Sequence, residues 1–387
     1  MWNPCRHRAT RGYPEPVSLQ IPSDLLPTDG RFGSGPARIR DAAVDSLAGP
    51  GRHVLGTSHR QPPVRGLVGR VQEALTELYG LPAGWAVVLG NGGSTLFWDA
   101  AVCSLVERRS AHGVFGEFSA KFAGAVRRAP HLADPVVTEA PAGGVAVPEA
   151  VDDIDVYAWA HNETSTGALA PVRRVGGPES LVVVDGTSAA GGVPLDLSAV
   201  DVYYFAPQKC LGSDGGLWLS LCSPAALERI ERVASTDRWI PDSLSLRLAV
   251  SNAERQQTLN TPAIATLWLL AEQLDWMLAS GGLGFAAGRS ARSAAQLYGW
   301  AEACPVATPF VAEPHRSPVV GTIDFDDTVD AAALAATLRT NGIVDTEPYR
   351  KLGRNQLRIG MYPTVDPTDV EALCECIDWL LERLPRR

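Results

Sequence analysis

Short apolar segments that alternate with helical segments are the feature that most constrains how this chain can fold. Each apolar segment spans four to seven residues and is rich in Val, Tyr, Trp or Leu. Continuous apolar runs of this length are typical of strands that are buried on both faces of a parallel sheet. Strands that alternate with helices indicate an α/β fold. The predicted strands are residues 86–89, 154–160, 181–184, 200–206 and 216–221.

The helical segments carry apolar residues at three- and four-residue steps, which places those residues on one face. The first such segment begins at Val64 and ends at Gly80, a residue type that commonly terminates helices. A second helix is predicted over residues 96–106 and a third over residues 262–279. For the third helix, Thr261 is the expected N-cap, because it stands directly before a proline at the first helical position.

The chain length of 387 residues is enough for two or three domains of about 150 residues each. Residues 1–27 have mixed polarity and several prolines, and we expect a disordered tail there. A large domain is predicted over residues 28–265 and a small α+β domain over residues 266–387. The predicted elements of the small domain are a strand at 319–325, a helix at 331–340 and a helix that opens at Asp366.

Charge and hydropathy exclude several classes of protein. The 34 Lys and Arg residues against 43 Asp and Glu give a formal net charge of −9, which argues against nucleic acid as a partner. No apolar run reaches the ~18 residues of a membrane span, and the first 20 residues lack the apolar core of a secretory signal. Seven scattered cysteines indicate reduced thiols and therefore a cytoplasmic protein. Cys374 and Cys376 are too close in sequence for a zinc pair, so we expect no metal site.

A glycine-rich loop, residues 90–95, follows the first predicted strand and leads into the helix at 96–106. Glycine lets a backbone approach an anion closely, and a helix N-terminus supplies free N–H groups. Ser94 and Thr95 add hydroxyl donors. The loop lacks the GxxxxGK[ST] and GxGxxG patterns, which argues against a nucleoside triphosphate and a dinucleotide. The pattern indicates either a phosphate site or a plain tight turn.

Two charged residues, Asp185 and Lys209, each follow a predicted buried strand. The ends of such strands are where α/β folds bind ligands. Taken alone, Asp185 is explained as well by a loop or a helix cap, and Lys209 by a solvated loop. Lysine is almost never buried without a partner, however, and one reason to keep it at a strand end is a Schiff base with a carbonyl cofactor.

The glycine-rich loop, Asp185 and Lys209 together match what pyridoxal phosphate requires of a protein. The loop would bind the phosphate of the cofactor. Asp185 would keep its ring nitrogen protonated, so that the ring accepts electrons from the substrate α-carbon. Lys209 would attach to the aldehyde and, once displaced by the substrate, would shuttle the α-proton.

Other candidates surround this constellation. Thr164 follows a predicted strand and could hydrogen-bond the cofactor, although a simple turn explains it equally well. Phe118 could stack on an aromatic ring, although a lone Phe is more often a core residue. Residues 350–358 carry four cations and no acid, and arginine matches carboxylate and phosphate geometry, although a solvated face is the usual explanation. The cationic candidates for substrate binding are Arg60, Arg350, Arg354 and Arg358.

Seven short motifs occur in a fixed order along the chain: residues 32–36 (FGSGP), 58–60 (SHR), 92–95 (GGST), 162–164 (NET), 184–185 (VD), 206–209 (APQK) and 259–262 (LNTP). In this order they resemble the phosphoserine aminotransferases, which are fold-type I pyridoxal-phosphate enzymes, and most closely the actinobacterial branch. The resemblance runs from about residue 21 to the C-terminus. It implies a large domain with a mostly parallel seven-stranded sheet flanked by helices, and a smaller C-terminal α+β domain.

The resemblance implies roles for the residues around the cofactor ring. Lys209 would carry the Schiff base, and Asp185 would pair with the pyridinium. Thr164 would contact the phenolic oxygen. Phe118 would stack on the ring, at a place where many members of the family have Trp.

The resemblance also implies how the cofactor phosphate is bound. Ser94, Thr95 and Gln208 would bind it from one subunit. Asn260 and Thr261 would reach it from the partner subunit. The active unit would therefore be a homodimer with shared active sites.

The cationic candidates fall into two groups in this resemblance. Arg60 and Arg358 would bind the substrate carboxylate. The His-Arg pair that handles the substrate phosphate in many family members is not found here, and Arg350 and Arg354 are the nearest substitutes.

The implied reaction transfers the amino group of L-glutamate to 3-phosphohydroxypyruvate, giving O-phospho-L-serine and 2-oxoglutarate in serine biosynthesis. It would follow a ping-pong course. The family also implies a second acceptor, 3-hydroxy-2-oxo-4-phosphonooxybutanoate, in pyridoxal phosphate biosynthesis. The substrates are small anions, which suits the arginine candidates.

Four alternatives remain open at this point. The nearest is a related aminotransferase that uses a non-phosphorylated keto acid such as glyoxylate. A cysteine desulfurase would need a cysteine in a mobile catalytic loop, and none is evident. A non-catalytic pyridoxal-phosphate sensor would carry an appended DNA-binding segment or basic arm, and this sequence shows neither. A dinucleotide oxidoreductase would carry a glycine fingerprint, which this sequence also lacks.

Overall fold

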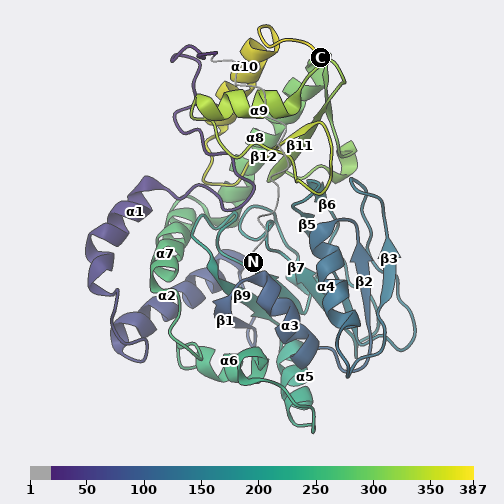
Figure 1. Cartoon of the computed structure of the whole chain (residues 1–387). Helices are drawn as coiled ribbons and strands as arrows, with labels where there is room; N and C mark the ends of the chain where they lie inside the picture. The colour runs from purple at the N-terminus through teal and green to yellow at the C-terminus, as the bar shows by residue number, and fades with distance from the viewer. Residues whose placement is uncertain (1–18) are drawn as a thin grey trace, which may run out of the picture.

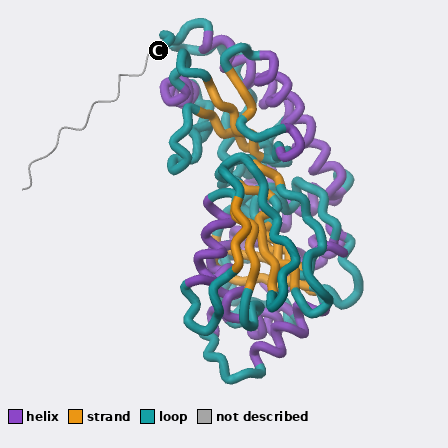
Figure 2. The backbone as a smooth tube through the Cα atoms, turned by 90° about the vertical axis from the view of Figure 1, so that its right-hand side faces the viewer, coloured by secondary structure: helices purple, strands orange, loops and turns teal. Residues whose placement is uncertain are grey.

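The computed structural model describes residues 19–387, which form a larger and a smaller lobe. Figure 1 shows the smaller lobe above the larger one, and the view turned by 90° in Figure 2 shows strands inside both lobes. Residues 1–18, the greater part of the predicted tail, lie outside the described residues. From residue 19 onward the segment contacts the smaller lobe, because Ile21 is buried there and its amide donates to Asn341 Oδ1 (2.9 Å).

The larger lobe is built on one sheet of seven strands. Their bounds are β1 Ala86–Gly92, β2 Ser110–Val114, β3 Val136–Glu139, β4 Val156–Ala160, β7 Leu181–Asp185, β8 Val202–Phe205 and β9 Gly216–Cys222. The spatial order is β1-β9-β8-β7-β4-β2-β3. β9 runs antiparallel to both of its neighbours, and the other neighbouring pairs are parallel. The predicted mostly parallel seven-stranded sheet is therefore confirmed.

Helices cover both faces of this sheet, as Figure 1 shows. Those of one face are α2 Pro62–Tyr79 and α7 Ile264–Ala279, and those of the other are α3 Ser94–Ser104, α4 Glu117–Arg127, α5 Pro224–Ala234 and α6 Leu246–Ala253. Successive residues of a strand point to opposite faces. Val182 and Val184 therefore pack with α2 and α7, and Val183 packs with α3 and α4. Because both faces are covered, the whole of β7 is buried, which is the physical reason for its continuous apolar run.

The predicted helices exist, but some of their ends differ. α2 ends as predicted at Gly80, which adopts a left-handed conformation with φ of 59°. α3 begins at Ser94, two residues before the predicted start. The prediction of Thr261 as the N-cap of α7 is wrong, because α7 begins at Ile264. The carbonyl of Thr261 is taken instead by Asn91 Nδ2 (2.9 Å), which holds this segment out of the helix.

The smaller lobe is a three-stranded antiparallel sheet covered by helices. Its elements are β10 Ala307–Pro309, β11 Val320–Phe325, β12 Gln356–Gly360, α8 Gly282–Ala303, α9 Ala331–Thr340 and α10 Pro367–Leu381, with the strands in the order β10-β11-β12. The predicted strand at 319–325 and the predicted helix at 331–340 are confirmed. The carboxylate of Asp366 caps α10 by accepting from Thr368 N (3.1 Å), at the predicted start of that helix.

The change from one hydrophobic core to the other falls within α8. Leu270 of α7 and Ala286 near the start of α8 pack with the large sheet, whereas Leu297, farther along α8, packs in the smaller lobe. The division into domains after residue 265 stays a prediction. Phe32 also belongs to the smaller core, so the beginning of the described chain crosses that lobe before it enters the larger one.

The remaining elements are short. They are α1 Asp41–Ala48, β5 Asn162–Glu163 and β6 Ala168–Leu169, with 3-10 turns η1 Pro50–His53, η2 Leu197–Ala199, η3 Asp242–Leu244 and η4 Glu313–His315. In the part of the chain from residue 19 to the C-terminus, no helix has both the length and the apolar character to cross a membrane.

The carboxyl ends of β4, β7 and β8 meet at one edge of the large sheet. In the strand register Ala160 pairs with Asp185, and Asp185 pairs with Tyr204. The loops that follow β4 and β8 therefore begin beside Asp185. The smaller lobe reaches this edge, because Arg358 of β12 donates to the carbonyl of Thr164 (Nη1 to O, 3.2 Å). Such an edge is where open α/β sheets place their ligands.

Candidate active site

Lys209 follows β8 and lies close to groups from distant parts of the chain. Its Nζ donates a hydrogen bond to the backbone carbonyl of Ser34 (2.7 Å). Burial and then the positive charge of Arg358 lower the pKa of Lys209 from 10.5 to about 8, while Asp185 acts weakly in the opposite direction. A lower pKa leaves more of the amine neutral near neutral pH, and the neutral amine is the nucleophile. The structure thus brings Lys209, Asp185 and Arg358 into one site.

Gly35 lies directly against the amine of Lys209. Its φ of +142° is a conformation that other residues rarely adopt, and an added Cβ would overlap Lys209 Nζ. The sequence motif at 32–36 carries no signal for this contact with Lys209, which was missed. Tyr362 was also missed, and its hydroxyl donates to the same Ser34 carbonyl (2.7 Å).

Asp185 is buried at the end of β7 and is joined by hydrogen bonds to the glycine-rich loop. Burial raises the pKa of Asp185, although hydrogen bonds from Thr187 partly offset this effect. The Thr187 amide donates to Asp185 Oδ1 (2.8 Å), and the Thr187 hydroxyl donates to Ser94 Oγ (2.6 Å). These two hydrogen bonds therefore fix the position of the Asp185 carboxylate relative to the predicted phosphate loop.

The predicted phosphate loop is divided between a strand and a helix. β1 continues to Gly92, and α3 begins at Ser94, which is buried while Thr95 is exposed. The first N–H groups of a helix lack intrahelical acceptors and favour an anion. Gln208, the neighbour of Lys209, has a buried Oε1 without a hydrogen-bond partner among residues 19–387. These groups supply both the donors and the unsatisfied polar atoms of a ligand site.

Thr164 lies in a hydrogen-bonded cluster after β4. Its hydroxyl donates to Ser188 Oγ (2.8 Å), which also accepts from Asn162 Nδ2 (2.8 Å). Asn162 Oδ1 is buried and has no partner among the described residues. The cluster therefore leaves one acceptor free at the same rim as Asp185.

Glu163 is fully buried and holds the N-terminus of α4 in place. Its carboxylate accepts hydrogen bonds from the amides of Phe118 (3.2 Å) and Ser119 (3.0 Å) and from the hydroxyls of Ser119 (2.9 Å) and Ser165 (2.7 Å). A carboxylate at a helix N-terminus is favoured by the free N–H groups there. Glu163 thus anchors Phe118 to the loop that carries Thr164. The sequence held no signal for this role.

Phe118 lies in a row of side chains that ends at Arg358. Its ring centroid is 6.1 Å from that of Tyr349 in a tilted arrangement, and the Arg358 guanidinium lies 5.3 Å from the Tyr349 ring. Lys121 Nζ also lies 5.3 Å from the Phe118 ring. The predicted stacking residue and the predicted carboxylate ligand are therefore connected through Tyr349.

The four cations of residues 350–358 have different surroundings. Arg358 is partly buried, its Nε has no hydrogen-bond partner, and no carboxylate pairs with it within residues 19–387. Burial lowers its pKa. Arg354 pairs with Asp324 and lies over the ring of Phe310, and Lys351 pairs with Glu117. Arg358 is thus the cation of this group that lies beside Lys209.

Arg60, Asn260 and Thr261 lie together but are not joined to Lys209 by any described contact. Arg60 donates to Gln257 Oε1 (2.7 Å) and to the carbonyl of Leu259 (3.3 Å). The Thr261 hydroxyl pairs with His59 Nδ1 (3.0 Å). Asn260 and Thr261 are exposed. Three of the predicted site residues therefore form a second cluster on the surface of the chain.

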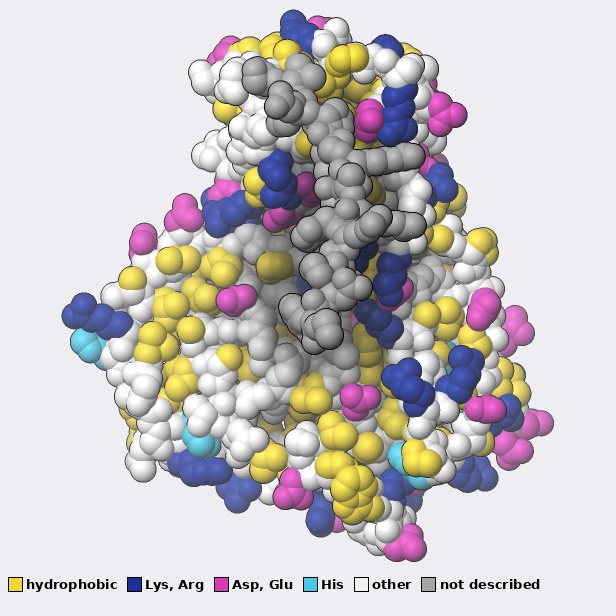
Figure 3. Space-filling model, viewed as in Figure 1, with side chains coloured by type: hydrophobic (Ala, Val, Ile, Leu, Met, Phe, Trp, Pro, Cys, Tyr) yellow, Lys and Arg dark blue, Asp and Glu magenta, His cyan; other side chains and the backbone are white. Residues whose placement is uncertain are grey.

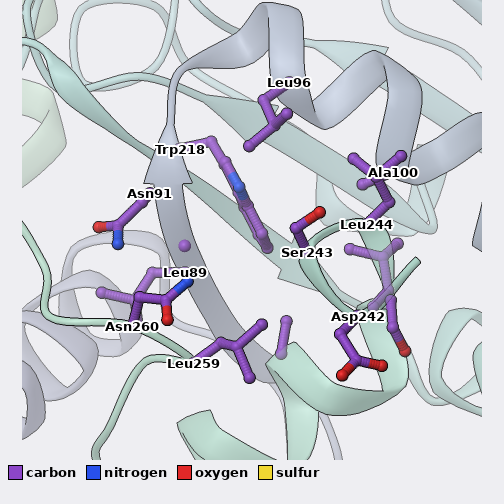
Figure 4. Close-up of a pocket in the computed structure, with 14 residues that line it drawn as sticks. Leu89, Asn91, Leu96, Ala100, Trp218, Asp242, Ser243, Leu244, Leu259 and Asn260 are labelled. Atoms are coloured by element: carbon purple, nitrogen blue, oxygen red, sulfur yellow. The ribbon is translucent and has the colours of Figure 1, made fainter.

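A small pocket of about 80 Å³ lies beside this second cluster. Figure 4 shows Asn91 and Trp218 on one side of it, with Leu259 and Asn260 below and Asp242 opposite. Small-molecule sites usually measure about 300–1,000 Å³. The pocket is too small to be the active site, and it borders residues that the family resemblance assigns to a subunit contact.

The surface carries no broad basic area on the face seen in Figure 3, outside the grey atoms. Lys and Arg side chains lie there among Asp and Glu side chains. This mixture accords with the net charge of −9.

Comparison with known protein families gives a match to one family model. The model described as Aminotransferase class-V matches residues 147–373, which contain Thr164, Asp185, Lys209 and Arg358. This range covers more than half of the chain.

Curated proteins of similar sequence extend the match to almost the whole chain. A phosphoserine aminotransferase from a Nocardioides species is 60% identical over 371 residues, which is 95% of this chain and 99% of that protein. A relative from Mycolicibacterium vanbaalenii is 58% identical over 369 residues with the same coverage, and it shares that family name.

Solved structures show the same fold at lower identity. The crystal structure of a phosphoserine aminotransferase from Cytophaga hutchinsonii covers 92% of this chain and all of its own, with 21% identity and a TM-score of 0.82. At that identity the similarity establishes the fold alone, which is the one that the sequence predicted.

Proposed function

The chain belongs to the class-V aminotransferase family, and from this premise we propose that it transfers the amino group of L-glutamate to 3-phosphohydroxypyruvate. The products are O-phospho-L-serine and 2-oxoglutarate, and the reaction serves serine biosynthesis. The cofactor of this aminotransferase is pyridoxal 5'-phosphate. The relatives that are 58% and 60% identical over nearly their full length support this substrate assignment. In the structure, the observation that carries the aminotransferase assignment is Arg358, which pairs with no carboxylate among residues 19–387 and lies beside the low-pKa amine of Lys209.

The residues of the rim fit pyridoxal phosphate. The buried acceptors Gln208 Oε1 and Asn162 Oδ1 lack partners among residues 19–387, as expected for a site that is built around another molecule. Lys209 would hold the cofactor, and Asp185 would pair with its ring nitrogen. When bound, the cofactor supplies an aldehyde that takes up the amino group and a ring that accepts electrons from the substrate α-carbon.

We assign the phosphate of the cofactor to the N-terminus of α3. Ser94 and Thr95 would donate their hydroxyls and the first helical amides, together with Gln208. Thr164 would contact the phenolic oxygen, and Phe118 would stack on the ring. The hydrogen-bond chain from Asp185 through Thr187 to Ser94 supports this assignment, because it fixes the two ends of the site relative to each other.

Lys209 is the proposed proton carrier of the reaction. Its pKa of about 8 lets the amine exist in both protonation states near neutral pH. A group with a pKa near the working pH can both accept and return a proton efficiently. Lys209 would thus remove the proton from the substrate α-carbon and deliver it to the cofactor carbon.

The substrate anions are assigned to the arginines. Arg358 would bind the α-carboxylate with its planar guanidinium. Arg350 is exposed, and we propose that it and Arg354 bind the substrate phosphate, with Arg354 first having to leave Asp324. These cations would also neutralise the charge that both substrates carry into the site.

We further propose a homodimer with shared active sites. Arg60, Asn260 and Thr261 cluster on the surface, and the family resemblance directs Asn260 and Thr261 to the cofactor phosphate of the partner. Since Arg60 is hydrogen-bonded to the same segment, it would enter the partner's site with them. Mixing a Lys209→Ala protein with an Arg60→Ala protein tests this arrangement, because a mixed dimer would regain one intact site. No recovery of activity would contradict it.

We place the enzyme in the cytoplasm. The six cysteines in the described part of the chain carry free thiols, in keeping with a reducing compartment. Fractionation of the source cells, followed by detection of the protein, tests this location.

The substrate assignment is tested with acceptors that differ only in the phosphate. The purified enzyme, given L-glutamate, should use 3-phosphohydroxypyruvate at least about 100-fold better in kcat/KM than hydroxypyruvate or glyoxylate, because only an acceptor with a phosphate gains the ion pairs with Arg350 and Arg354. A preference for glyoxylate would overturn the substrate assignment and favour the alternative aminotransferase. Formation of O-phospho-L-serine is followed by chromatography of the amino-acid products.

A further inference from the structure

The backbone carbonyl of Ser34 accepts two hydrogen bonds from side chains that are far away in sequence. Lys209 Nζ donates to it at 2.7 Å, and Tyr362 Oη donates to it at 2.7 Å. A carbonyl oxygen has two lone pairs, so these two donors satisfy it fully. Ser34 is 4% exposed and Tyr362 is fully buried. The carbonyl is therefore committed to these two partners.

The segment around Ser34 is attached to both lobes. From the smaller lobe, the amide of Gly360 donates to the carbonyl of Phe32 (2.7 Å). From the larger lobe, the carbonyl of Gln208, next to Lys209, accepts from the amide of Ala37 (2.8 Å). The segment is thus fixed to one lobe at Phe32 and to the other at Ala37. Between these two points, the hydroxyl of Tyr362 holds the Ser34 carbonyl, which accepts from the Lys209 amine.

The ring and the hydroxyl of Tyr362 have separate roles. The ring packs in an apolar cluster with Val193, Cys210 and Val319, and a phenylalanine would fill that space as well. A buried hydroxyl costs free energy unless it is hydrogen-bonded. What the hydroxyl adds is therefore the contact with Ser34.

We propose that Tyr362 is a positioning residue, whose hydroxyl fixes the Ser34 carbonyl as a cradle for the amine of Lys209 whenever that amine is not attached to the cofactor. The inference rests on the proposed function, since it takes Lys209 as the cofactor lysine. In each catalytic cycle the substrate displaces the amine, which must then return. An amine held on one fixed carbonyl returns faster than one that samples many rotamers.

The charges around the pair allow this arrangement. Arg358, Asp185 and Cys210 act on Lys209, and Cys210 and Arg358 act on Tyr362. Burial raises the pKa of Tyr362 well above that of free tyrosine, so its hydroxyl keeps its proton and remains a donor throughout the working range of pH. The Ser34 carbonyl can only accept, and the direction of both hydrogen bonds is therefore fixed.

The test compares two tyrosine variants. Tyr362→Phe removes the hydroxyl at the cradle. Tyr298→Phe is the matched control, because the buried hydroxyl of Tyr298 also donates to a backbone carbonyl of the smaller lobe, that of Ser317 (2.9 Å). The apoprotein of each variant is mixed rapidly with pyridoxal phosphate, and the visible absorption of the lysine-bound cofactor is followed with time. Steady-state kcat and the KM for L-glutamate are measured on the holoenzymes.

Tyr362→Phe should slow the attachment of the cofactor about tenfold and lower kcat to a similar extent, which is what one ordering hydrogen bond is worth. Its KM for L-glutamate should stay within about twofold of the wild-type value, because Arg358 is untouched. Tyr298→Phe should leave the attachment rate and kcat unchanged, and both variants should lose a comparable small amount of thermal stability.

Two results would overturn the proposal. One is a Tyr362→Phe apoprotein that attaches the cofactor as fast as the Tyr298→Phe control. The other is a Tyr362→Phe protein that melts far below the control or does not fold, since the hydroxyl would then serve the fold rather than the amine. A wild-type apoprotein that forms no visible band at all would instead refute the proposed function, so the two failures are distinguishable.

Discussion

Replacing Lys209 by Met in the apoprotein tests the electrostatic account of the site. Methionine has a similar shape but no proton to bind. In the folded chain the pKa of Lys209 is lowered from 10.5 to about 8. At 1.36 kcal/mol per pKa unit, the protonated amine costs the folded state about 3 kcal/mol at most. Methionine also loses the hydrogen bond to Ser34, which is worth about 1 kcal/mol.

The sign of the effect depends on pH. Below about pH 8 the Lys209 amine is protonated in both the folded and the unfolded chain, and the folded chain bears the whole free-energy cost of the buried charge. Between about 8 and 10.5 the unfolded chain binds a proton that the folded chain does not, so wild-type stability rises with pH. Lys209→Met should therefore be more stable than the wild type by about 2 kcal/mol near pH 7 and less stable by about 1 kcal/mol above pH 10.5.

The assay is urea unfolding of the two apoproteins, followed by tryptophan fluorescence at several pH values from about 7 to about 11. Lys121→Met, which removes an exposed lysine, is the control and should show no crossover. A difference in unfolding free energy between Lys209→Met and the wild type that stays constant over this range would refute the reasoning, because it would mean that the amine titrates as an ordinary lysine.

Three further predictions concern the other charged groups. Arg358→Gln should raise the KM for L-glutamate about 100-fold and raise the pKa of the free Lys209 amine, whereas Arg354→Gln should leave the KM for glutamate nearly unchanged. Steady-state kinetics measure the KM, and urea unfolding of the apoprotein at several pH values measures the pKa. Asp185→Asn should lower kcat about 10²- to 10⁴-fold while the cofactor still attaches, and a variant with near-normal kcat would disprove the assigned role. Glu163→Gln should lower the unfolding free energy by about 1–3 kcal/mol, because the buried carboxylate accepts several hydrogen bonds. Urea unfolding measures this loss, with Glu117→Gln as the control. A loss no greater than that of the control would contradict the anchoring role of Glu163.

The sheet could be predicted from the sequence because burial on both faces leaves a continuous apolar run in each strand. The same reasoning predicts Asp185 and Lys209 at one edge, since Asp185 ends β7, Lys209 follows β8, and the two strands are parallel neighbours. Gly80 was found as a helix end because its left-handed conformation is one that glycine adopts readily.

Contacts between distant segments could not be read from the sequence. Ser34 meets Tyr362 across 328 positions, and a serine whose function lies in its carbonyl has no side-chain signature. Glu163 has no sequence signature, because it is bonded to backbone amides, which every sequence contains, and to a serine hydroxyl from another segment. Thr261 has the residue type of an N-cap, but a tertiary contact from Asn91 delays the helix until Ile264.

The central claim is that Lys209 carries the cofactor, and peptide mapping tests it directly. The chain contains three lysines, Lys121, Lys209 and Lys351, so reduction of the holoenzyme with borohydride followed by proteolysis and mass spectrometry has few possible outcomes. We expect one pyridoxyl phosphate group per chain, on the peptide that contains Lys209. A group on the peptide of Lys121 or Lys351, or an unmodified Lys209 in a protein that retains its visible band, would contradict the claim.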